Sequence, residues 1–158
     1  MRILSFDQAT AKTGFAVFDN DKLIESGVIK AKADTSTDKL NEMFSLVVLK
    51  IESTNPDIVV IEGVVLQKSP YVLIMLAQLQ GMIVGYCHKK GVLIEIFGAT
   101  TWRKNLNFNQ GIKVARKELK RQAKEYASRL TDKKVTEDEA DAICIGSSYV
   151  KSRILGGN

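Results

Sequence analysis

Four acidic residues in this chain could together bind divalent metal ions. Asp7 and Glu62 each follow a short apolar run that predicts a β-strand, and strand ends of this kind form the edge at which open α/β sheets bind ligands. Asp138 and Asp141 are three residues apart, a spacing that puts both on one face of a helix. Four clustered carboxylates repel one another unless cations lie among them, and hard divalent cations prefer oxygen ligands. We therefore predict a site for Mg²⁺, which Mn²⁺ can replace.

Each of these acids also has a structural explanation. An Asp after a strand is commonly a turn residue, and Thr136 with Glu139 matches a capping box at the start of a helix. That helix start would also favour Asp138 through its dipole. Glu62, in contrast, follows four apolar residues that predict a buried central strand, where a carboxylate favours function. Asp141 is one turn too deep for capping, so the joint placement of the acids indicates a site.

Composition limits the class of protein. With 158 residues, 45% of them hydrophobic, the chain is predicted to form a single domain over residues 1–158. There is no run of 18 apolar residues and no charged leader, so we expect a cytoplasmic protein without a membrane partner. Cys87 and Cys144 match no metal-ligand spacing, and His88 is the only histidine. We expect two buried thiols, and neither a zinc site nor a catalytic histidine.

Positive charge is concentrated in one segment. Residues 103–134 contain eleven Lys or Arg against three acids, an excess of eight, whereas the whole chain has a net charge of +5 and the remainder therefore −3. A solvated surface helix would alternate the signs of its charges. A basic segment beside an acidic metal site is typical of a protein that binds and acts on a phosphate backbone. The predicted DNA-binding residues are Arg103, Lys104, Lys113, Arg116, Lys117, Lys120, Arg121 and Lys124.

Hydrophobic periodicity and turn residues predict a mixed α/β fold. Strands are expected at residues 2–7, about 13–19, about 22–30, 58–62 and 92–97. Helices are expected around residues 40–51, from 69 to about 89, and at about 100–106, 112–129 and 137–150. The first three strands could form a meander, and helices and strands then alternate. This order predicts a five-stranded mixed sheet flanked by helices.

At this point the chain resembles a known family. The stretch DQATAKTGF at residues 7–15, the strand that ends at Glu62 and the pair Asp138 and Asp141 resemble the RuvC-type Holliday junction resolvases, bacterial or bacteriophage-encoded, of the ribonuclease H-like fold. The resemblance covers essentially the whole chain. It implies that Asp7 and the other three acids hold two metal ions per site. The resemblance also implies that the protein makes paired, metal-dependent nicks in four-way junctions, with other branched DNA as a further candidate substrate.

The same resemblance implies further residues and partners. Lys104 and Lys113 fall where the family has lysines near the scissile phosphate; phosphate-steering charge is the alternative role for both. The helix from residue 70 to 84 has little polar face, so it must be covered on more than the sheet side. The resemblance implies that a second subunit covers it, in a homodimer that cuts two opposed strands. A branch-migration motor remains an open partner.

Two departures from the family affect the expected activity. Gln8 and Ala9 stand where the family has Pro-Gly, so the turn after Asp7 lacks the conformational freedom of glycine. The residues after Glu62 include no aromatic side chain of the kind that wedges between junction bases, and Tyr71 is the candidate replacement. We expect a relaxed sequence preference in cleavage.

Two other classes of protein share parts of the pattern. Asp7, Thr10 and Thr13-Gly14 after a strand are also similar to the phosphate loop of actin-like ATPases and sugar kinases, which need two lobes where this chain has room for one. A non-catalytic module for binding branched DNA would keep the basic segment and use its acids structurally. ATP hydrolysis would indicate the first class, and metal-independent junction binding without nicking the second.

Overall fold

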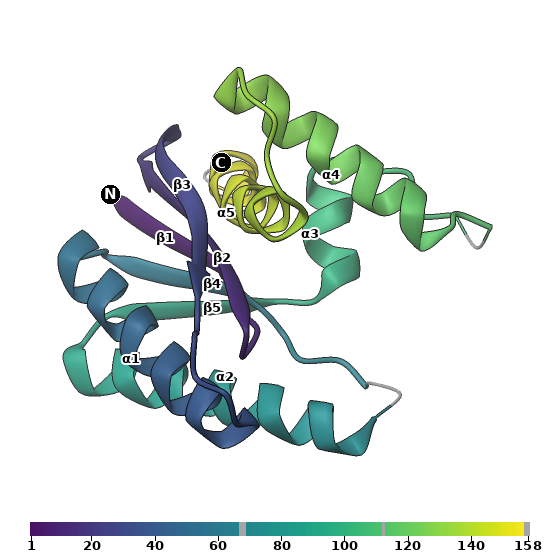
Figure 1. The fold of residues 1–158 in the computed structure, drawn as a ribbon. Coiled ribbons are helices and arrows are strands. Elements are labelled where there is room, and N and C mark those ends of the chain that lie inside the picture. Colours follow the sequence, from purple (N-terminus) through teal and green to yellow (C-terminus); the bar gives the residue numbers. More distant parts are fainter. Residues whose placement is uncertain (67–68, 112, 157–158) are drawn as a thin grey trace.

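A five-stranded mixed sheet forms the centre of the molecule (Figure 1). The computed structural model describes residues 1–66, 69–111 and 113–156. The first three strands form an antiparallel meander, and the fourth pairs in parallel with both the first and the fifth. The predicted fold class, a mixed five-stranded sheet flanked by helices, is therefore confirmed. The spatial order is β3-β2-β1-β4-β5, with β1 at Arg2–Asp7, β2 at Lys12–Asp19, β3 at Lys22–Lys30, β4 at Ile58–Glu62 and β5 at Leu93–Phe97.

Helices cover both faces of this sheet. Side chains of β1 alternate between two cores: Ile3 packs beneath the C-terminal helices, whereas Leu4 and Phe6 pack against the other helical layer. Successive strand residues point to opposite faces, so the central strand contributes to both cores. One face carries α1 (Ser36–Thr54) and α2 (Pro70–Lys90), and the other carries α3 (Ala99–Asn105), α4 (Arg116–Thr131) and α5 (Glu137–Gly156) (Figure 1).

The long helix α2 begins and ends where its cap residues predict. The Ser69 hydroxyl accepts a hydrogen bond from Val72 N at 3.4 Å, and Pro70 occupies the first helical position. Gly91 ends the helix in the left-handed conformation with φ 71°, which glycine adopts without strain. Cys87, on the inner side of this helix, is fully buried, and burial raises the pKa of its thiol to about 11. Cys144 is also a buried free cysteine, so the prediction of two buried thiols is confirmed.

Two helix boundaries differ from the prediction. The basic helix α4 begins at Arg116 rather than near residue 112, which lies outside the described residues. Val114 N donates to Gly111 O at 2.8 Å and Ala115 is extended, so a turn precedes the helix. The C-terminal helix α5 continues past residue 150 to Gly156. Its last turns carry polar residues that break the apolar periodicity used to predict its end.

Helix α5 lies so close to the sheet that there is room only for glycine at two contact positions, one on the sheet and one on the helix. A Cβ at Gly14 of β2 would lie 1.9 Å from the carbonyl oxygen of Asp138, and a Cβ at Gly146 of α5 would lie 2.3 Å from the ring of Phe18. Ser5 Oγ, fully buried in β1, donates to the carbonyl of Ala142 at 2.7 Å. The first turns of α5 are therefore held against the ends of β1 and β2.

Replacing Gly14 tests this close contact. We expect Gly14→Ala to cost about 3 kcal/mol or more of the free energy of unfolding, because the new methyl group meets helix backbone that cannot rotate away. Gly111→Ala is the matched control, since its Cβ would meet only ordinary contacts at 3.7 Å and beyond, and it should be neutral or slightly stabilising. Urea unfolding of both variants measures the difference, and equal stability would contradict the close approach.

Candidate active site

The four predicted acids line one cavity at the carboxyl ends of β1 and β4. Asp7 ends β1 and Glu62 ends β4, while Asp138 and Asp141 project from the first turns of α5. The cavity has a volume of about 510 Å³. Three basic side chains, Arg103, Arg116 and Lys120, also line it, together with the acid Glu137. The structure therefore brings together residues that are more than 130 positions apart in the sequence.

Burial and neighbouring acids raise the pKa of two of these carboxyl groups, Asp7 and Asp141. Burial raises the pKa of Asp7 well above its usual value, and the negative charges of Asp141, Glu62 and Asp138 raise it further, in that order. The pKa of Asp141 is raised to about 6, first by burial and then by the charge of Glu62. Lys120 acts in the opposite direction on both groups. This mutual repulsion is the electrostatic property expected of a site that a cation completes.

The donor chemistry of the cavity fits a hard divalent cation. All four candidate ligands are carboxylates, the oxygen donors that Mg²⁺ and Mn²⁺ take. Among the described residues, no three Asp, Glu, His or Cys side chains converge on one point closely enough to enclose a metal ion. Mutually repelling carboxylates are expected to spread apart, because only a bound cation offsets their charge. Side-chain rotation would close the ligand set around an ion.

Glu62 accepts hydrogen bonds on both its main-chain carbonyl and its carboxylate. The Trp102 indole Nε1 donates to Glu62 Oε2 at 2.6 Å, and Gln8 Nε2 donates to the Glu62 carbonyl at 2.5 Å. The next amide, Gly63 N, donates to Phe97 O at 2.8 Å. Sequence reasoning missed Trp102 and Gln8 as site residues. Trp102 did give one signal, as the only Trp of the chain directly before Arg103.

The capping box predicted at the start of α5 is only half formed. Glu139 N donates to Thr136 Oγ1 at 3.2 Å, which is the expected cap. The Glu139 carboxylate, however, accepts from Ser26 Oγ at 2.8 Å and pairs with Lys133 at 3.1 Å. It therefore ties α5 to β3 instead of returning to its own helix. The adjacent Asp138 is left to face the cavity.

Comparisons with known proteins point to one family. The family profile described as crossover junction endodeoxyribonuclease RuvC matches residues 3–148. RuvC of Hydrogenovibrio crunogenus is 33% identical over 86 residues, which are 52% of this chain and 50% of that relative. RuvC of Dictyoglomus turgidum is 27% identical over 157 residues, 95% of this chain and 96% of that relative. A structure of Thermus thermophilus RuvC in complex with a Holliday junction substrate superimposes with a TM-score of 0.78 at 13% identity, covering 99% of this chain and 97% of the other.

This chain belongs to the RuvC family. The matched residues include all four predicted acids, Asp7, Glu62, Asp138 and Asp141. The match to H. crunogenus spans about half of that relative's length, whereas the match to D. turgidum spans nearly all of it. The structural likeness shows the RuvC fold, so the resemblance and the ribonuclease H-like fold predicted from sequence are both confirmed.

Neither of the two lysines predicted to be catalytic in this RuvC-family chain lines the cavity. Lys104 and Lys113 are exposed and do not line the cavity, whereas Arg103 does. Arg103 lies over the Trp102 ring at 4.7 Å, and its Nε is buried without a hydrogen-bond partner among the described residues. Its positive charge lowers the pKa of Asp141. A catalytic role for Lys104 or Lys113 stays a prediction.

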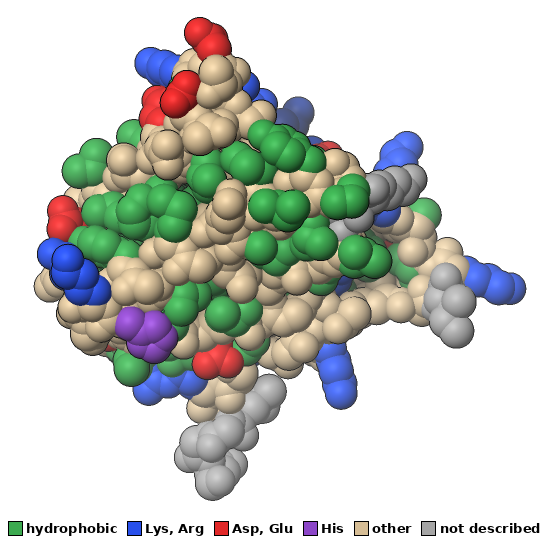
Figure 2. Space-filling view, turned by 90° about the horizontal axis from the view of Figure 1, so that it is seen from below, with side chains coloured by type: hydrophobic (Ala, Val, Ile, Leu, Met, Phe, Trp, Pro, Cys, Tyr) green, Lys and Arg blue, Asp and Glu red, His purple; other side chains and the backbone are tan. Residues whose placement is uncertain are grey.

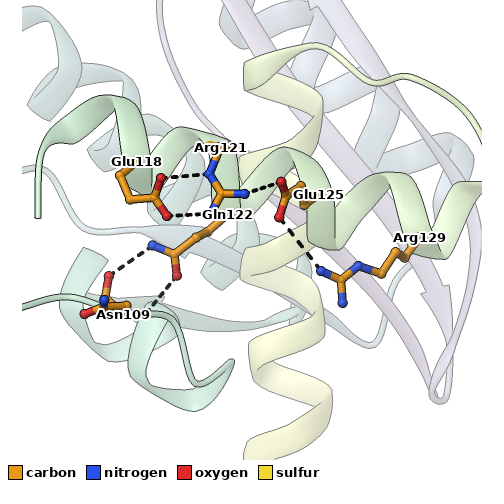
Figure 3. Close-up of polar contacts among 6 residues, drawn as sticks. All are labelled: Asn109, Glu118, Arg121, Gln122, Glu125 and Arg129. Atoms are coloured by element: carbon orange, nitrogen blue, oxygen red, sulfur yellow. Dashed lines mark hydrogen bonds and ion pairs between the residues drawn. The ribbon is translucent and has the colours of Figure 1, made fainter.

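The predicted basic segment is partly neutralised within α4. Figure 3 shows Arg121 between Glu118, 2.7 Å away, and Glu125, which also pairs with Arg129 at 3.9 Å. The two ion pairs raise the pKa of Arg121. Sequence counting therefore overestimated the free positive charge of this helix. DNA binding by Arg121 remains a prediction, and it would require the loss of these pairs.

Two other predicted DNA-binding lysines are also paired. Lys120 forms an ion pair with Glu137, and Lys124 lies 3.7 Å from the same carboxylate. Among the described residues, Lys104, Lys113, Arg116 and Lys117 take part in no ion pair. Within the same described part of the chain, Arg103 also forms no ion pair but is less exposed than these four residues, whose charge is therefore the most available of the predicted set to a phosphate backbone.

The raised pKa of Asp141 predicts how stability depends on pH without metal. The folded carboxyl holds its proton up to about pH 6, whereas the unfolded one loses it near 3.8. The folded state therefore binds more protons between these values, and stability falls as pH rises through them, by up to about 3 kcal/mol. Asp141→Asn cannot ionise, so we expect this variant to be more stable than the wild type at pH 7 and similar near pH 4.

Urea unfolding in EDTA between pH 4 and pH 7 measures this effect. Asp21→Asn, at an exposed position in the turn after β2, is the matched control and should follow the wild-type curve. Adding Mg²⁺ at pH 7 should stabilise the wild type more than Asp141→Asn, since only the wild type keeps the full ligand charge. An Asp141→Asn variant that is less stable than the wild type at pH 7 in EDTA would reject the repulsion argument.

Proposed function

We propose that this protein is a Holliday junction resolvase, an endodeoxyribonuclease that cuts four-way DNA junctions by paired nicks. The observation that carries the proposal is the single cavity in which Asp7, Glu62, Asp138 and Asp141 lie beside Arg103 and two further basic side chains. Membership of the RuvC family supports the same activity. The Thermus thermophilus relative was solved in complex with a Holliday junction substrate, which supports branched DNA as the ligand here.

The four carboxylates are proposed to hold Mg²⁺, with Mn²⁺ as a substitute and two ions per site. RuvC-family enzymes are metal-dependent nucleases, and bound metal would activate a water and stabilise the leaving 3′ oxygen of the phosphodiester. The chain supplies the surrounding groups. All three other acids act on Asp7, because each of their charges raises its pKa. Arg103 brings a positively charged guanidinium to the cavity wall, where it could bind a phosphate.

The unpaired cations beside the cavity are proposed to position the DNA backbone. Arg116 lines the cavity, Lys117 follows it on α4, and Lys104 follows Arg103 on α3. Contacts of this kind are with phosphates, so they carry affinity rather than sequence information. Junction binding should therefore weaken steeply with salt. This agrees with the relaxed sequence preference expected from the missing aromatic residue after Glu62.

A second copy of the chain is proposed to cover α2. Met75, Leu79 and Ile83 face the core on the inner side of this helix, but its outer side exposes Tyr71, Val72 and Ile74 at 54%, 44% and 54%. Figure 2 shows apolar side chains gathered over this face of the molecule. Open space lies over Gly81 and Gly85, one turn apart, where a facing helix could approach closely.

The same helix is long and apolar enough to cross a membrane, and only 22% of its most apolar 18-residue stretch is buried in the structure. A homodimer accounts for the exposed face and also for paired cuts, because two opposed strands of a junction need two sites related by a two-fold axis. Localisation in the cytoplasm is proposed with it.

Junction cleavage tests the proposed activity. A synthetic four-way junction is incubated beside linear duplex and a three-way fork, with Mg²⁺ or with EDTA. We expect paired symmetrical nicks on the junction in Mg²⁺ only. Asp7→Asn should abolish cleavage, by at least about 10³-fold since a metal ligand is lost, while junction binding stays equal or improves because a repelling charge is removed.

The outcomes separate the candidate functions. Equal cutting of forks would broaden the activity to a branch-selective nuclease. Tight junction binding without nicks would identify a DNA-binding module, and ATP hydrolysis without nicks would indicate the nucleotide hydrolase class. A folded Asp7→Asn protein that loses binding and cleavage together would reject the assigned role of Asp7.

Disrupting the outer face of α2 tests the homodimer. We expect Ile74→Glu to be monomeric at about 10 μM, because a buried unpaired charge in an apolar interface costs several kcal/mol. Paired nicks should then become uncoordinated single nicks. Ile24→Glu, at a similarly exposed site on β3 (47%), is the matched control and should remain dimeric. Analytical ultracentrifugation measures both variants, and a monomeric wild type that binds lipid vesicles would replace the dimer with a membrane partner.

A further inference from the structure

The only tryptophan of the chain is bonded directly to one of the four acids. Trp102 Nε1 donates to Glu62 Oε2 at 2.6 Å, and the Trp102 side chain is only 1% exposed. The indole has one N–H and no other polar atom, so Glu62 receives its entire hydrogen-bonding capacity. An N–H donating to a carboxylate forms one of the stronger hydrogen bonds in proteins.

The indole, on α3, is held in place by aromatic packing from the loop that follows α3 and from α4. The ring of Phe108 meets it edge to face at 5.9 Å, and Phe108 in turn packs on Tyr126 at the same distance. The Arg103 guanidinium lies over the ring at 4.7 Å. With this packing the N–H cannot move far from Glu62. A buried indole N–H without an acceptor would be destabilising, so the bond also anchors α3 to the end of β4.

Glu62 differs from the other acids in being fixed before any ligand arrives. Its carbonyl accepts from Gln8 Nε2 and its Oε2 accepts from Trp102. Within the described residues, no hydrogen bond is made to the carboxylates of Asp7, Asp138 or Asp141. One oxygen of Glu62, Oε1, therefore remains for a ligand in the cavity, and its range of positions is narrow.

We propose that Trp102 is a positioning residue that presents Glu62 Oε1 to cations in the cavity and reports their binding through its fluorescence. The proposal rests on the metal-dependent activity proposed above. It adds a residue that would not bind the metal itself but would orient one of its ligands. Groups that hydrogen-bond a metal ligand orient it, and their loss commonly weakens metal binding by about 10 to 100-fold. The indole N–H is in contact with the ligand charge, so a cation at Glu62 changes the electric field on the fluorophore.

A replacement of one atom tests the proposal. Because the chain has a single Trp, growth on benzothienylalanine exchanges the indole N–H for sulfur at position 102 alone and keeps the bicyclic shape. We expect this protein to bind Mg²⁺ about tenfold more weakly in isothermal titration calorimetry. The Mg²⁺ concentration for half-maximal junction cleavage should rise by the same factor, with junction affinity within about twofold of the wild type. Trp102→Phe should act in the same direction, and urea unfolding verifies that each protein is folded.

Fluorescence gives a reading that needs no DNA. Titrating Mg²⁺ into the natural protein should shift Trp102 emission with the same half-saturation as calorimetry, and Glu62→Gln should lose the shift. Phe108→Leu keeps the N–H donor but loosens the packing that holds the indole, so its Mg²⁺ affinity should fall by less than that of the benzothienylalanine protein.

The outcomes distinguish this proposal from the proposed function. Junction cleavage with an unchanged Mg²⁺ requirement in the benzothienylalanine protein would overturn the positioning role while the resolvase function stands. Mg²⁺ binding that shifts the emission, without cleavage of any branched DNA, would support the positioning role and reject the function. Calorimetric Mg²⁺ binding with no emission change, or no Mg²⁺ binding at all, would overturn the role of Trp102.

Discussion

The active cavity depends on how closely α5 approaches the sheet. At Gly14 and Gly146 the facing atoms leave no room for a methyl group, and the Ser5 hydroxyl bonds a carbonyl of the helix. A helix packed at the usual distance from a sheet would hold its first turn farther from the end of β1. Asp138 and Asp141 would then lie farther from Asp7, and the mutual repulsion of the acids would weaken with distance. The glycines thus determine the charge density of the cavity.

The buried acids repel one another, which lowers the stability of the fold, and several contacts offset part of this repulsion. Burial and like charges raise the pKa of Asp7 and of Asp141, so the site opposes folding near neutral pH when no cation is present. Lys120 and Arg103 reduce the repulsion, and the Trp102 N–H stabilises the charge of Glu62. The hydrophobic cores on both faces of the sheet stabilise the fold enough to offset the repulsion that remains. A cation would remove the remaining repulsion, so folding and metal binding are coupled.

The sequence predicts the sheet and the four acids well because local pattern determines both. Apolar runs with sharp ends located β1 and β4 to the residue, and an acid at a strand end is visible without tertiary knowledge. The bond between Trp102 and Glu62 joins residues forty positions apart, and no local pattern encodes it. A count of charges does not show that Arg121 is enclosed by Glu118 and Glu125, although their i,i+3 and i,i+4 spacing on a helix would have indicated these pairs. The start of α4 was misplaced because a turn precedes it that apolar periodicity does not reveal.

The basic residues divide into those that line the cavity and those held in ion pairs with acids of α4 or α5. Ion pairs within α4 stiffen the helix, and Gln122 joins it to the preceding loop by accepting from Asn109 N and donating to Asn109 O (Figure 3). Lys120 belongs to both groups, since it lines the cavity and pairs with Glu137, the residue before Asp138. A phosphate that approaches Lys120 competes with Glu137 for the same ammonium group. Because Glu137 begins α5, its ion pairs with Lys120 and Lys124 join α4 to the helix that carries Asp138 and Asp141.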